Sequence, residues 1–325
     1  MQNASVHLKS LPVQPYRRDF LRQAGVLLNL AGLGGLGACA QLGATAQEQV
    51  GTPLTVRSSG YLNRADCSIY YEVTGQGPAL VFAHGLGGNH ISWWQQVPHF
   101  AKRYTCITFA HRGFNPSREA PGSGGPRTNP DDLAALIDHL KLDRVTLVAQ
   151  SMGGWTCLEY ALREPNRVRA IVMGSTSGTV DYRLIKRPEL NDLDAWLARS
   201  RTASADLQRR HIIPVAGERL AREQPALSLL YSSIFALTPS EFRELVRAEN
   251  ARLRTKPPEI LSRLPMPVFY IAGEEDPQFP PQVAPALAAI TPRGRSVIVP
   301  RSGHSVHFER ASDFNRLVDE FLAAL

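Results

Sequence analysis

Short apolar runs alternate with longer amphipathic segments along most of this chain. Seven runs have the length and the β-branched, apolar composition of strands, and several contain no polar residue. They span residues 68–73, 79–83, 105–109, 145–149, 170–173, 268–272 and 296–299. Uninterrupted apolar runs are typical of strands buried on both faces of a parallel sheet. The alternation therefore predicts an α/β fold, in which helices cover a mostly parallel sheet.

Residues 179–261 interrupt this alternation. The segment has a helical pattern without a convincing strand, and it holds 14 Lys/Arg and 11 Asp/Glu residues, a net charge of +3. Ligands of open α/β sheets bind beyond the carboxyl ends of the strands. A helical insertion between two strands therefore predicts a lid over that edge. The domain prediction is a core of 60–178 and 262–325, a lid of 179–261 and a preceding linker of 47–59.

The first 46 residues have the three-part organisation of an export signal. Paired arginines at 17 and 18 precede a glycine-rich apolar stretch over 24–36, and Ala-Thr-Ala at 44–46 has the pattern of a cleavage site. The arginines followed by Phe-Leu resemble a twin-arginine signal, which predicts recognition by the export machinery and a periplasmic or secreted protein. The apolar stretch is shorter than the roughly 18 residues that favour a transmembrane helix.

A lipoprotein box is the alternative interpretation of this segment. The sequence Leu-Gly-Ala-Cys ends at Cys39, and lipidation of that cysteine would anchor the protein at the membrane surface. Cleavage after Ala46 and lipidation at Cys39 both remain open.

The net charge and the cysteine spacing indicate which partners and ligands this protein lacks. The formal net charge is +7, but beyond residue 46 it falls to +4, and no Lys/Arg run is interleaved with aromatic residues. This argues against a nucleic-acid partner. The four cysteines include no C-x-x-C pair, so no metal site is expected. Cys106 and Cys157 fall in apolar segments, where free buried thiols are common.

The strand-like run before residue 150 ends at a serine between small residues. Ser151 is flanked by Ala149 and Gly153, and a helical pattern begins directly afterwards. A sharp strand-to-helix turn exposes its central residue and needs small neighbours so that its two arms can approach. This is a Gly-x-Ser-x-Gly nucleophile elbow with Ala149 in the first glycine position. The helix N-terminus beside the hydroxyl favours a developing negative charge.

A serine nucleophile needs a base and an acid that orients the base. Gly-Glu-Glu-Asp ends at Asp276 after the run 268–272, and Arg-Ser-Gly-His ends at His304 after the run 296–299. In this order, the motifs resemble those of the α/β-hydrolase superfamily. The resemblance implies a doubly wound, mostly parallel sheet of the eight-stranded type with a helical lid insertion.

The resemblance also assigns the catalytic roles. It implies Ser151 as nucleophile, His304 as general base and Asp276 as the orienting acid. From the residues alone, Glu274 or Glu275 is the alternative acid and His307 the alternative histidine. The backbone N–H groups of Met152 and Leu86 would form the oxyanion hole, because Leu86 follows His-Gly in a glycine-rich loop. His84 in that loop is expected to order it. The candidates for the substrate pocket are Trp93, Trp94 and Gln150, although the tryptophans also suit helix-to-sheet packing.

These residues predict a serine hydrolase that cleaves a carboxylic ester, thioester or lactone through an acyl-enzyme, without a metal or cofactor. Dehalogenases and epoxide hydrolases of the superfamily use a carboxylate nucleophile, and this chain has Ser151. Ser-Met-Gly-Gly also resembles carbon–carbon-bond hydrolases of aromatic ring-fission products, but those follow the histidine with Trp, where this chain has Ser305. Such a hydrolase, a cofactor-free perhydrolase and a ligand-binding homologue without turnover remain alternatives.

Overall fold

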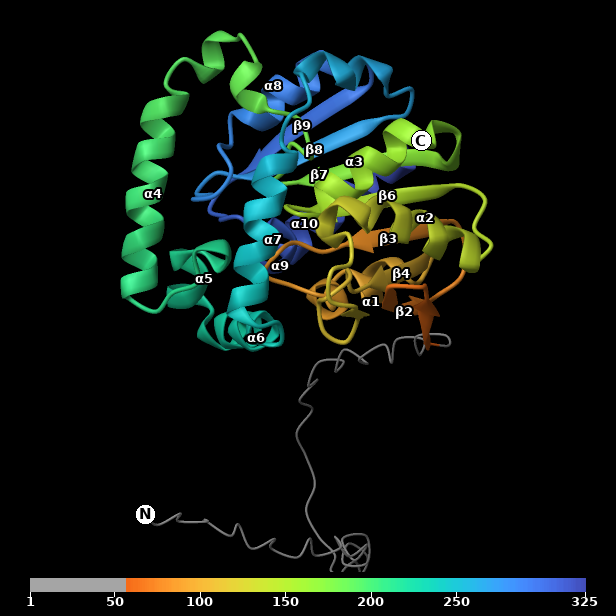
Figure 1. The fold of residues 1–325 in the computed structure, drawn as a ribbon. Helices are drawn as coiled ribbons and strands as arrows, with labels where there is room; N and C mark the ends of the chain where they lie inside the picture. Colours follow the sequence, from red (N-terminus) through yellow and green to blue (C-terminus); the bar gives the residue numbers. More distant parts are fainter. Residues whose placement is uncertain (1–56) are drawn as a thin grey trace, which may run out of the picture. The chain divides into compact units, whose positions relative to one another are not determined.

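Nine strands join in one sheet in the computed structural model, which describes residues 57–325 (Figure 1). The strands are β1 (Ser58–Asn63), β2 (Cys67–Thr74), β3 (Ala79–Ala83), β4 (Thr105–Phe109), β5 (Arg118–Glu119), β6 (Val145–Gln150), β7 (Val168–Gly174), β8 (Val268–Gly273) and β9 (Gly294–Val299). Their order across the sheet is β1-β2-β4-β3-β6-β7-β8-β9, and β5 pairs with β2. From β4 to β9 all neighbours are parallel, whereas β1, β2 and β4 pair antiparallel. The predicted mostly parallel α/β sheet is confirmed.

Two strands were not predicted from the sequence. β1 alternates between exposed and half-buried residues and contains two serines and a glycine, so it lacks an apolar run. β5 has only two residues. β1 begins at Ser58, two residues before the predicted start of the core and inside the predicted linker. The export signal, Cys39 and the first part of the linker lie outside the described residues.

Helices cover both faces of the sheet. They are α1 (Val97–Phe100), α2 (Asn129–His139), α3 (Gly153–Arg163), α4 (Leu193–Arg209), α5 (Glu218–Glu223), α6 (Pro225–Ala236), α7 (Ser240–Leu253), α8 (Val283–Ile290), α9 (Val306–Glu309) and α10 (Ala311–Ala323). On one face α2, α3 and α8 bury an apolar cluster that includes Leu136, Tyr160 and Leu287. On the other face α1 and α10 contribute Phe100 and Phe314 to a second cluster. The site is therefore carried by a sheet that is buried on both sides.

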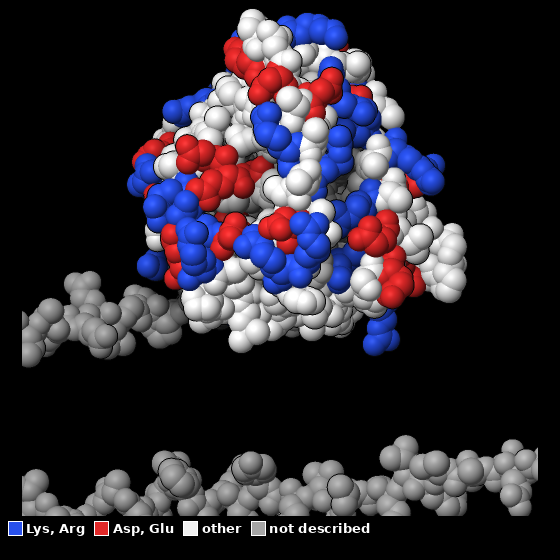
Figure 2. Space-filling model, turned by 90° about the vertical axis from the view of Figure 1, so that its left-hand side faces the viewer, with Lys and Arg blue, Asp and Glu red and all other residues white. Residues whose placement is uncertain are grey.

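The helices α4 to α7 form the insertion between β7 and β8. In Figure 1 they lie along the left side of the sheet, and Figure 2 shows that side with Lys/Arg and Asp/Glu side chains interspersed. The two ends of the insertion meet, because Val180 and Lys256 form a parallel bridge. The N–H of Lys256 donates to the Thr179 carbonyl at 3.0 Å, and the N–H of Asp181 donates to the Lys256 carbonyl at 2.9 Å. The insertion thus leaves and rejoins the core at one point.

Three free cysteines lie in the described part of the chain. Cys67, Cys106 and Cys157 are buried, and burial raises the pKa of the Cys67 and Cys106 thiols to about 12. The expected buried thiols are therefore confirmed and unreactive at neutral pH. From residue 57 onward no helix is long and apolar enough to cross a membrane. The same residues hold no group of three or more side chains that could bind a metal ion.

Candidate active site

Ser151 lies at the turn between β6 and α3 with a φ of +48°, in the left-handed region that non-glycine residues rarely adopt. Its N–H donates to the Gly174 carbonyl on β7 at 2.9 Å. On the other side, a Cβ added at Gly153 would lie 2.1 Å from the Ala83 carbonyl oxygen of β3, so only glycine fits there. The turn is held between two strands, and Ser151 lines a cavity.

Asp276 and His304 meet at the same edge, in the loops that follow β8 and β9. The His304 Nδ1 atom lies 2.8 Å from Oδ2 and 3.0 Å from Oδ1 of Asp276. The carboxylate also accepts the N–H groups of Gln278 and Phe279 at 2.7 and 2.9 Å, which fixes its orientation. Because a carboxylate faces Nδ1, the proton belongs on that nitrogen and Nε2 is the basic one. His304 lines the same cavity as Ser151.

The alternative acid and histidine lie elsewhere. Glu275 is exposed and pairs with Arg219 of α5 at 2.5 Å. His307 is buried against Trp93, with ring centroids 4.4 Å apart, and burial lowers the pKa of its imidazole to about 3. Neither residue lines the cavity that contains Ser151. Of the candidates, Asp276 is the carboxylate in contact with His304.

The residues predicted for the oxyanion hole, Leu86 and Met152, both line the cavity. Their backbone N–H groups donate to no protein acceptor within residues 57–325, so both are free for a ligand. His84 orders the loop before Leu86: its Nδ1 hydrogen-bonds to the Gly85 carbonyl at 2.8 Å, and its Nε2 accepts the N–H of His111 at 2.9 Å. Burial lowers the pKa of His84 to about 3, so the ring stays neutral.

The cavity has a volume of about 250 Å³ and lies between the core and the insertion. Its apolar lining comprises Leu86, Met152, Trp155, Val215, Phe235, Ala251 and Phe279. Its polar lining comprises Ser151, Ser175, Thr176, Ser177, Arg247, Asn250, Arg254, Gln278 and His304. Residues of α3, of the insertion and of the loops that follow β3, β6, β7, β8 and β9 thus line the cavity that contains the candidate nucleophile.

The pocket prediction for Trp93, Trp94 and Gln150 is wrong, because none of them lines the cavity. Trp93 is fully buried against Phe82, and Trp94 turns to solvent with 42% of its surface exposed. Gln150 is buried, and its amide donates to the His304 carbonyl at 3.3 Å, so it supports the histidine loop. The tryptophan that does line the cavity is Trp155, which was not predicted from the sequence.

The sequence profile of a family described as "alpha/beta hydrolase fold" matches residues 78–311. The chain belongs to the α/β-hydrolase family.

Curated relatives of this α/β-hydrolase include enzymes with different substrates. This chain is 26% identical to 3-oxoadipate enol-lactonase 2 of Acinetobacter baylyi over 226 residues, which cover 66% of this chain and 79% of that protein. It is 27% identical to 2-hydroxymuconate semialdehyde hydrolase of a Pseudomonas strain over 265 residues, 77% of this chain and 88% of that protein. Among solved structures, "Est816 as an N-Acyl homoserine lactone degrading enzyme" matches with a TM-score of 0.65 and 25% identity, covering 81% of this chain and 100% of that one. Together with the family profile, these matches support a hydrolase.

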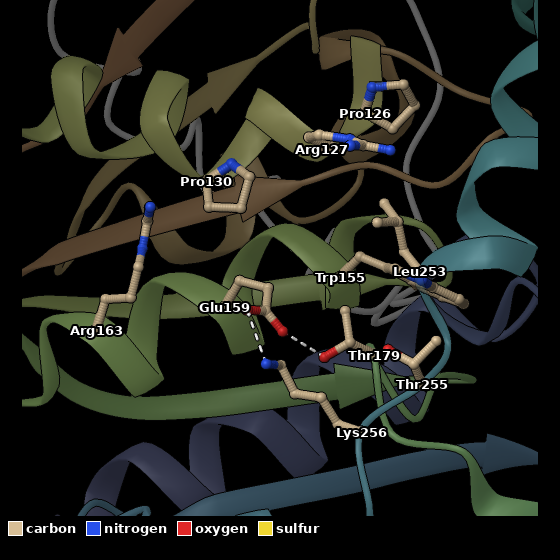
Figure 3. Close-up of a pocket in the computed structure, with 10 residues that line it drawn as sticks. All are labelled: Pro126, Arg127, Pro130, Trp155, Glu159, Arg163, Thr179, Leu253, Thr255 and Lys256. Carbon is tan, nitrogen blue, oxygen red and sulfur yellow. Dashed lines mark hydrogen bonds and ion pairs between the residues drawn. The ribbon is translucent and has the colours of Figure 1, made fainter. Parts of the chain in front are cut away.

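A second hollow of about 210 Å³ lies beside the candidate active site of this α/β-hydrolase, and Trp155 lines both. Figure 3 shows that Glu159 of α3 contacts Thr179 and Lys256, the two ends of the insertion. Arg127 and Arg163 pair with carboxylates of other elements. Every charged group of this hollow is thus paired. We interpret this hollow as the place where α3, the helix that follows Ser151, is joined to the two ends of the insertion.

The insertion also contacts the histidine loop of the α/β-hydrolase. The Ser305 hydroxyl donates to the Val215 carbonyl at 2.7 Å and lies 3.0 Å from the Tyr231 hydroxyl. On the core side, the Glu309 carboxylate accepts the N–H of Gly303 at 2.7 Å and the N–H of Ser305 at 2.9 Å. These two amides flank His304 in the chain. Glu309 and the insertion therefore hold the candidate base from two sides.

The buried carboxylate of Glu309 makes folding stability depend on pH. Burial raises its pKa from 4.5 to about 7, so the folded protein binds the proton more tightly than the unfolded chain. Its stabilising contribution is fully present below about pH 4.5 and is lost as the pH rises through 7, up to about 3 kcal/mol. We expect Glu309→Gln to lack this dependence. Urea unfolding at pH 4.5 and 8 should show wild type losing stability relative to the variant, and a constant difference would contradict the assignment.

Proposed function

We propose that this protein is a serine hydrolase that cleaves a carboxylic ester or lactone through an acyl-enzyme. The observation that supports this most strongly is the buried Asp276–His304 pair at the rim of a cavity that also holds Ser151. Ser151 occupies a strained turn at the N-terminus of α3, where a nucleophile is exposed and negative charge is stabilised. Ser151, Asp276 and His304 lie in the loops after β6, β8 and β9, and these strands end at the same edge of the sheet.

In this mechanism the Ser151 Oγ attacks the substrate carbonyl carbon while His304 Nε2 takes the hydroxyl proton. The carbonyl oxygen becomes an oxyanion, which accepts hydrogen bonds from the N–H groups of Leu86 and Met152. Collapse breaks the bond to the alcohol oxygen, and His304 gives that oxygen its proton. His304 then takes a proton from water, and the resulting hydroxide attacks the acyl carbon. The bond from that carbon to Ser151 Oγ breaks, the acid is released, and His304 gives its proton back to Oγ.

The insertion 179–261 is proposed to act as a lid. Val215, Phe235 and Arg247 belong to it and line the same cavity as Ser151, so a substrate would be enclosed between the insertion and the core. Enclosure excludes water and strengthens electrostatic interactions at the carbonyl. Because the lid contributes a large part of the lining, it would also determine which esters or lactones fit.

Ester or lactone cleavage is preferred over carbon–carbon bond cleavage. The matching proteins include some named for lactones and others named as semialdehyde or oxo-dienoate hydrolases, so their names favour neither reaction. The residue after His304 is Ser305, which bonds to the insertion through Val215 and Tyr231. In the carbon–carbon hydrolases that the sequence resembles, this position is usually Trp. A serine hydrolase for esters or lactones is the better fit.

Covalent labelling tests the proposal directly. A fluorophosphonate probe should react with Ser151 in stoichiometric amount, and mass spectrometry of the peptide should locate the label there. A panel of 4-nitrophenyl esters and acyl homoserine lactones then measures turnover. The absence of both labelling and turnover would favour a ligand-binding homologue, and cleavage of a ring-fission ketone without ester turnover would favour the carbon–carbon hydrolase.

A further inference from the structure

The charged lining of the active-site cavity has one sign. Arg247 and Arg254 line it, and no Asp or Glu is among the lining residues. Asp276, which stands behind His304, is 3% exposed. Arg247, Asn250 and Arg254 follow one another at spacings of three and four residues, so α7 and its C-terminal end turn one face of hydrogen-bond donors to the cavity. A cavity whose only charged lining side chains, within the described residues, are arginines favours an anionic ligand.

Arg254 has no protein acceptor within residues 57–325. No carboxylate lies within salt-bridge distance of it in the described residues, and none of its guanidinium N–H groups makes a hydrogen bond there, although its Nε atom is buried. Instead the guanidinium lies over the rings of Trp155 and Tyr182, 5.2 and 5.1 Å from their centroids. These cation–π contacts hold the guanidinium beside two aromatic rings, and its N–H groups remain available to a carboxylate. By contrast, Arg247 has a partner in Glu244 at 3.3 Å.

Ser175 gives an independent indication of a polar ligand. It is 2% exposed, lines the same cavity, and its buried hydroxyl has no hydrogen-bond partner in the part of the chain that the structure describes. Its φ of +49° places it in the left-handed region directly after β7, next to the Gly174 carbonyl that binds the Ser151 amide. Buried hydroxyl groups are normally paired, so an unpaired one beside the nucleophile suits a polar atom of the substrate.

We propose that the substrate carries a carboxylate remote from its scissile bond and that Arg254 binds this carboxylate. The Ser175 hydroxyl donates to a polar atom nearer the carbonyl, and the apolar lining around Phe235 and Phe279 takes the hydrocarbon between them. The inference rests on the proposed serine hydrolase and adds the substrate class, namely half-esters of dicarboxylic acids or lactones that bear a carboxylate.

A matched substrate pair tests this. Mono-4-nitrophenyl glutarate carries the remote carboxylate, and its methyl ester, methyl 4-nitrophenyl glutarate, is neutral at that end. Wild type should prefer the acid. Arg254→Gln should lower kcat/KM for the acid by about 30-fold, as loss of a charged hydrogen-bond pair does, and change the neutral ester by less than about threefold. Arg252→Gln is the control, because Arg252 lies two residues away, is 78% exposed and does not line the cavity.

Calorimetric titration with glutarate separates this inference from the proposed function, because it needs no turnover. Wild type should bind glutarate, Arg254→Gln should lose that binding, and Ser175→Ala should weaken it by about threefold or more. Equal glutarate binding by wild type and Arg254→Gln, or equal use of both esters by both proteins, would overturn the inference while leaving the serine hydrolase intact. If neither ester is cleaved and Ser151 is not labelled, the proposed function fails and the glutarate titration still decides the anion site. Unchanged melting temperatures of the variants exclude misfolding as the cause.

Discussion

Replacement of Ser151 by alanine is expected to lower kcat for ester hydrolysis by about 10⁴- to 10⁶-fold, the range seen when a serine hydrolase loses its nucleophile. The oxyanion donors and the cavity remain in the variant, so substrate binding should change little. The residual rate would come from those groups alone. Steady-state kinetics on a 4-nitrophenyl ester, together with loss of the fluorophosphonate label, measures the effect.

The strained backbone at position 151 needs a control for folding. Ser262 is an exposed serine whose hydroxyl bonds only to the Glu259 carbonyl, so Ser262→Ala should keep wild-type activity. Alanine at 151 must adopt the same φ of +48° as serine, so the melting temperature should be similar. A Ser151→Ala protein that retains more than about 1% of the wild-type rate would contradict the acyl-enzyme mechanism.

The second large effect is expected for Asp276→Asn, which should lower kcat by about 10⁴-fold. The carboxylate accepts the proton on His304 Nδ1 at 2.8 Å, which leaves Nε2 free to act as a base. Asparagine is anchored by the Gln278 and Phe279 amides through its oxygen, so its NH₂ group turns to the imidazole and favours the wrong tautomer. The pH profile of kcat/KM for wild type and the variant measures the loss.

Glu275→Gln is the matched control for this variant. Glu275 is the adjacent carboxylate and pairs with Arg219 at the surface, so its loss should change kcat by less than about twofold. If Glu275→Gln were the damaging substitution and Asp276→Asn the mild one, the acid of the triad would have to be reassigned.

The sheet could be predicted because its buried strands are continuous apolar runs with distinct ends. β6, for example, is buried throughout, and its end at Gln150 is marked by the small residues around Ser151. The edge strand β1 carries no such pattern, because one side of it faces solvent. Ser151, Asp276 and His304 each lie in a loop that follows a strand, and parallel strands bring their carboxyl ends to one edge. Their roles came from the resemblance to the α/β-hydrolases.

The pocket lining could not be predicted in the same way, because it depends on how helices pack. Trp93 follows the oxyanion loop in the chain, but its short 3-10 turn packs on the sheet and buries the ring. Trp155 lies four residues after Ser151 on α3, so it returns to the same side of the helix. That spacing was a usable signal. No sequence pattern, however, indicated that Arg254 would stack on Trp155, because the two are brought together by the fold of the insertion.

Because Val180 and Lys256 are paired, the segment between them could be replaced as one unit. Since its two ends are adjacent in space, exchanging everything between them for the corresponding segment of another family member would leave the order of the strands unchanged. Such an exchange would replace the hydrogen-bond donors of α7 that line the cavity. It would leave Ser151, Asp276 and His304 unchanged, because they lie in loops of the core. Arg247 and Arg254 would be exchanged together with the insertion, whereas Ser175 and Phe279 of the same cavity would stay with the core.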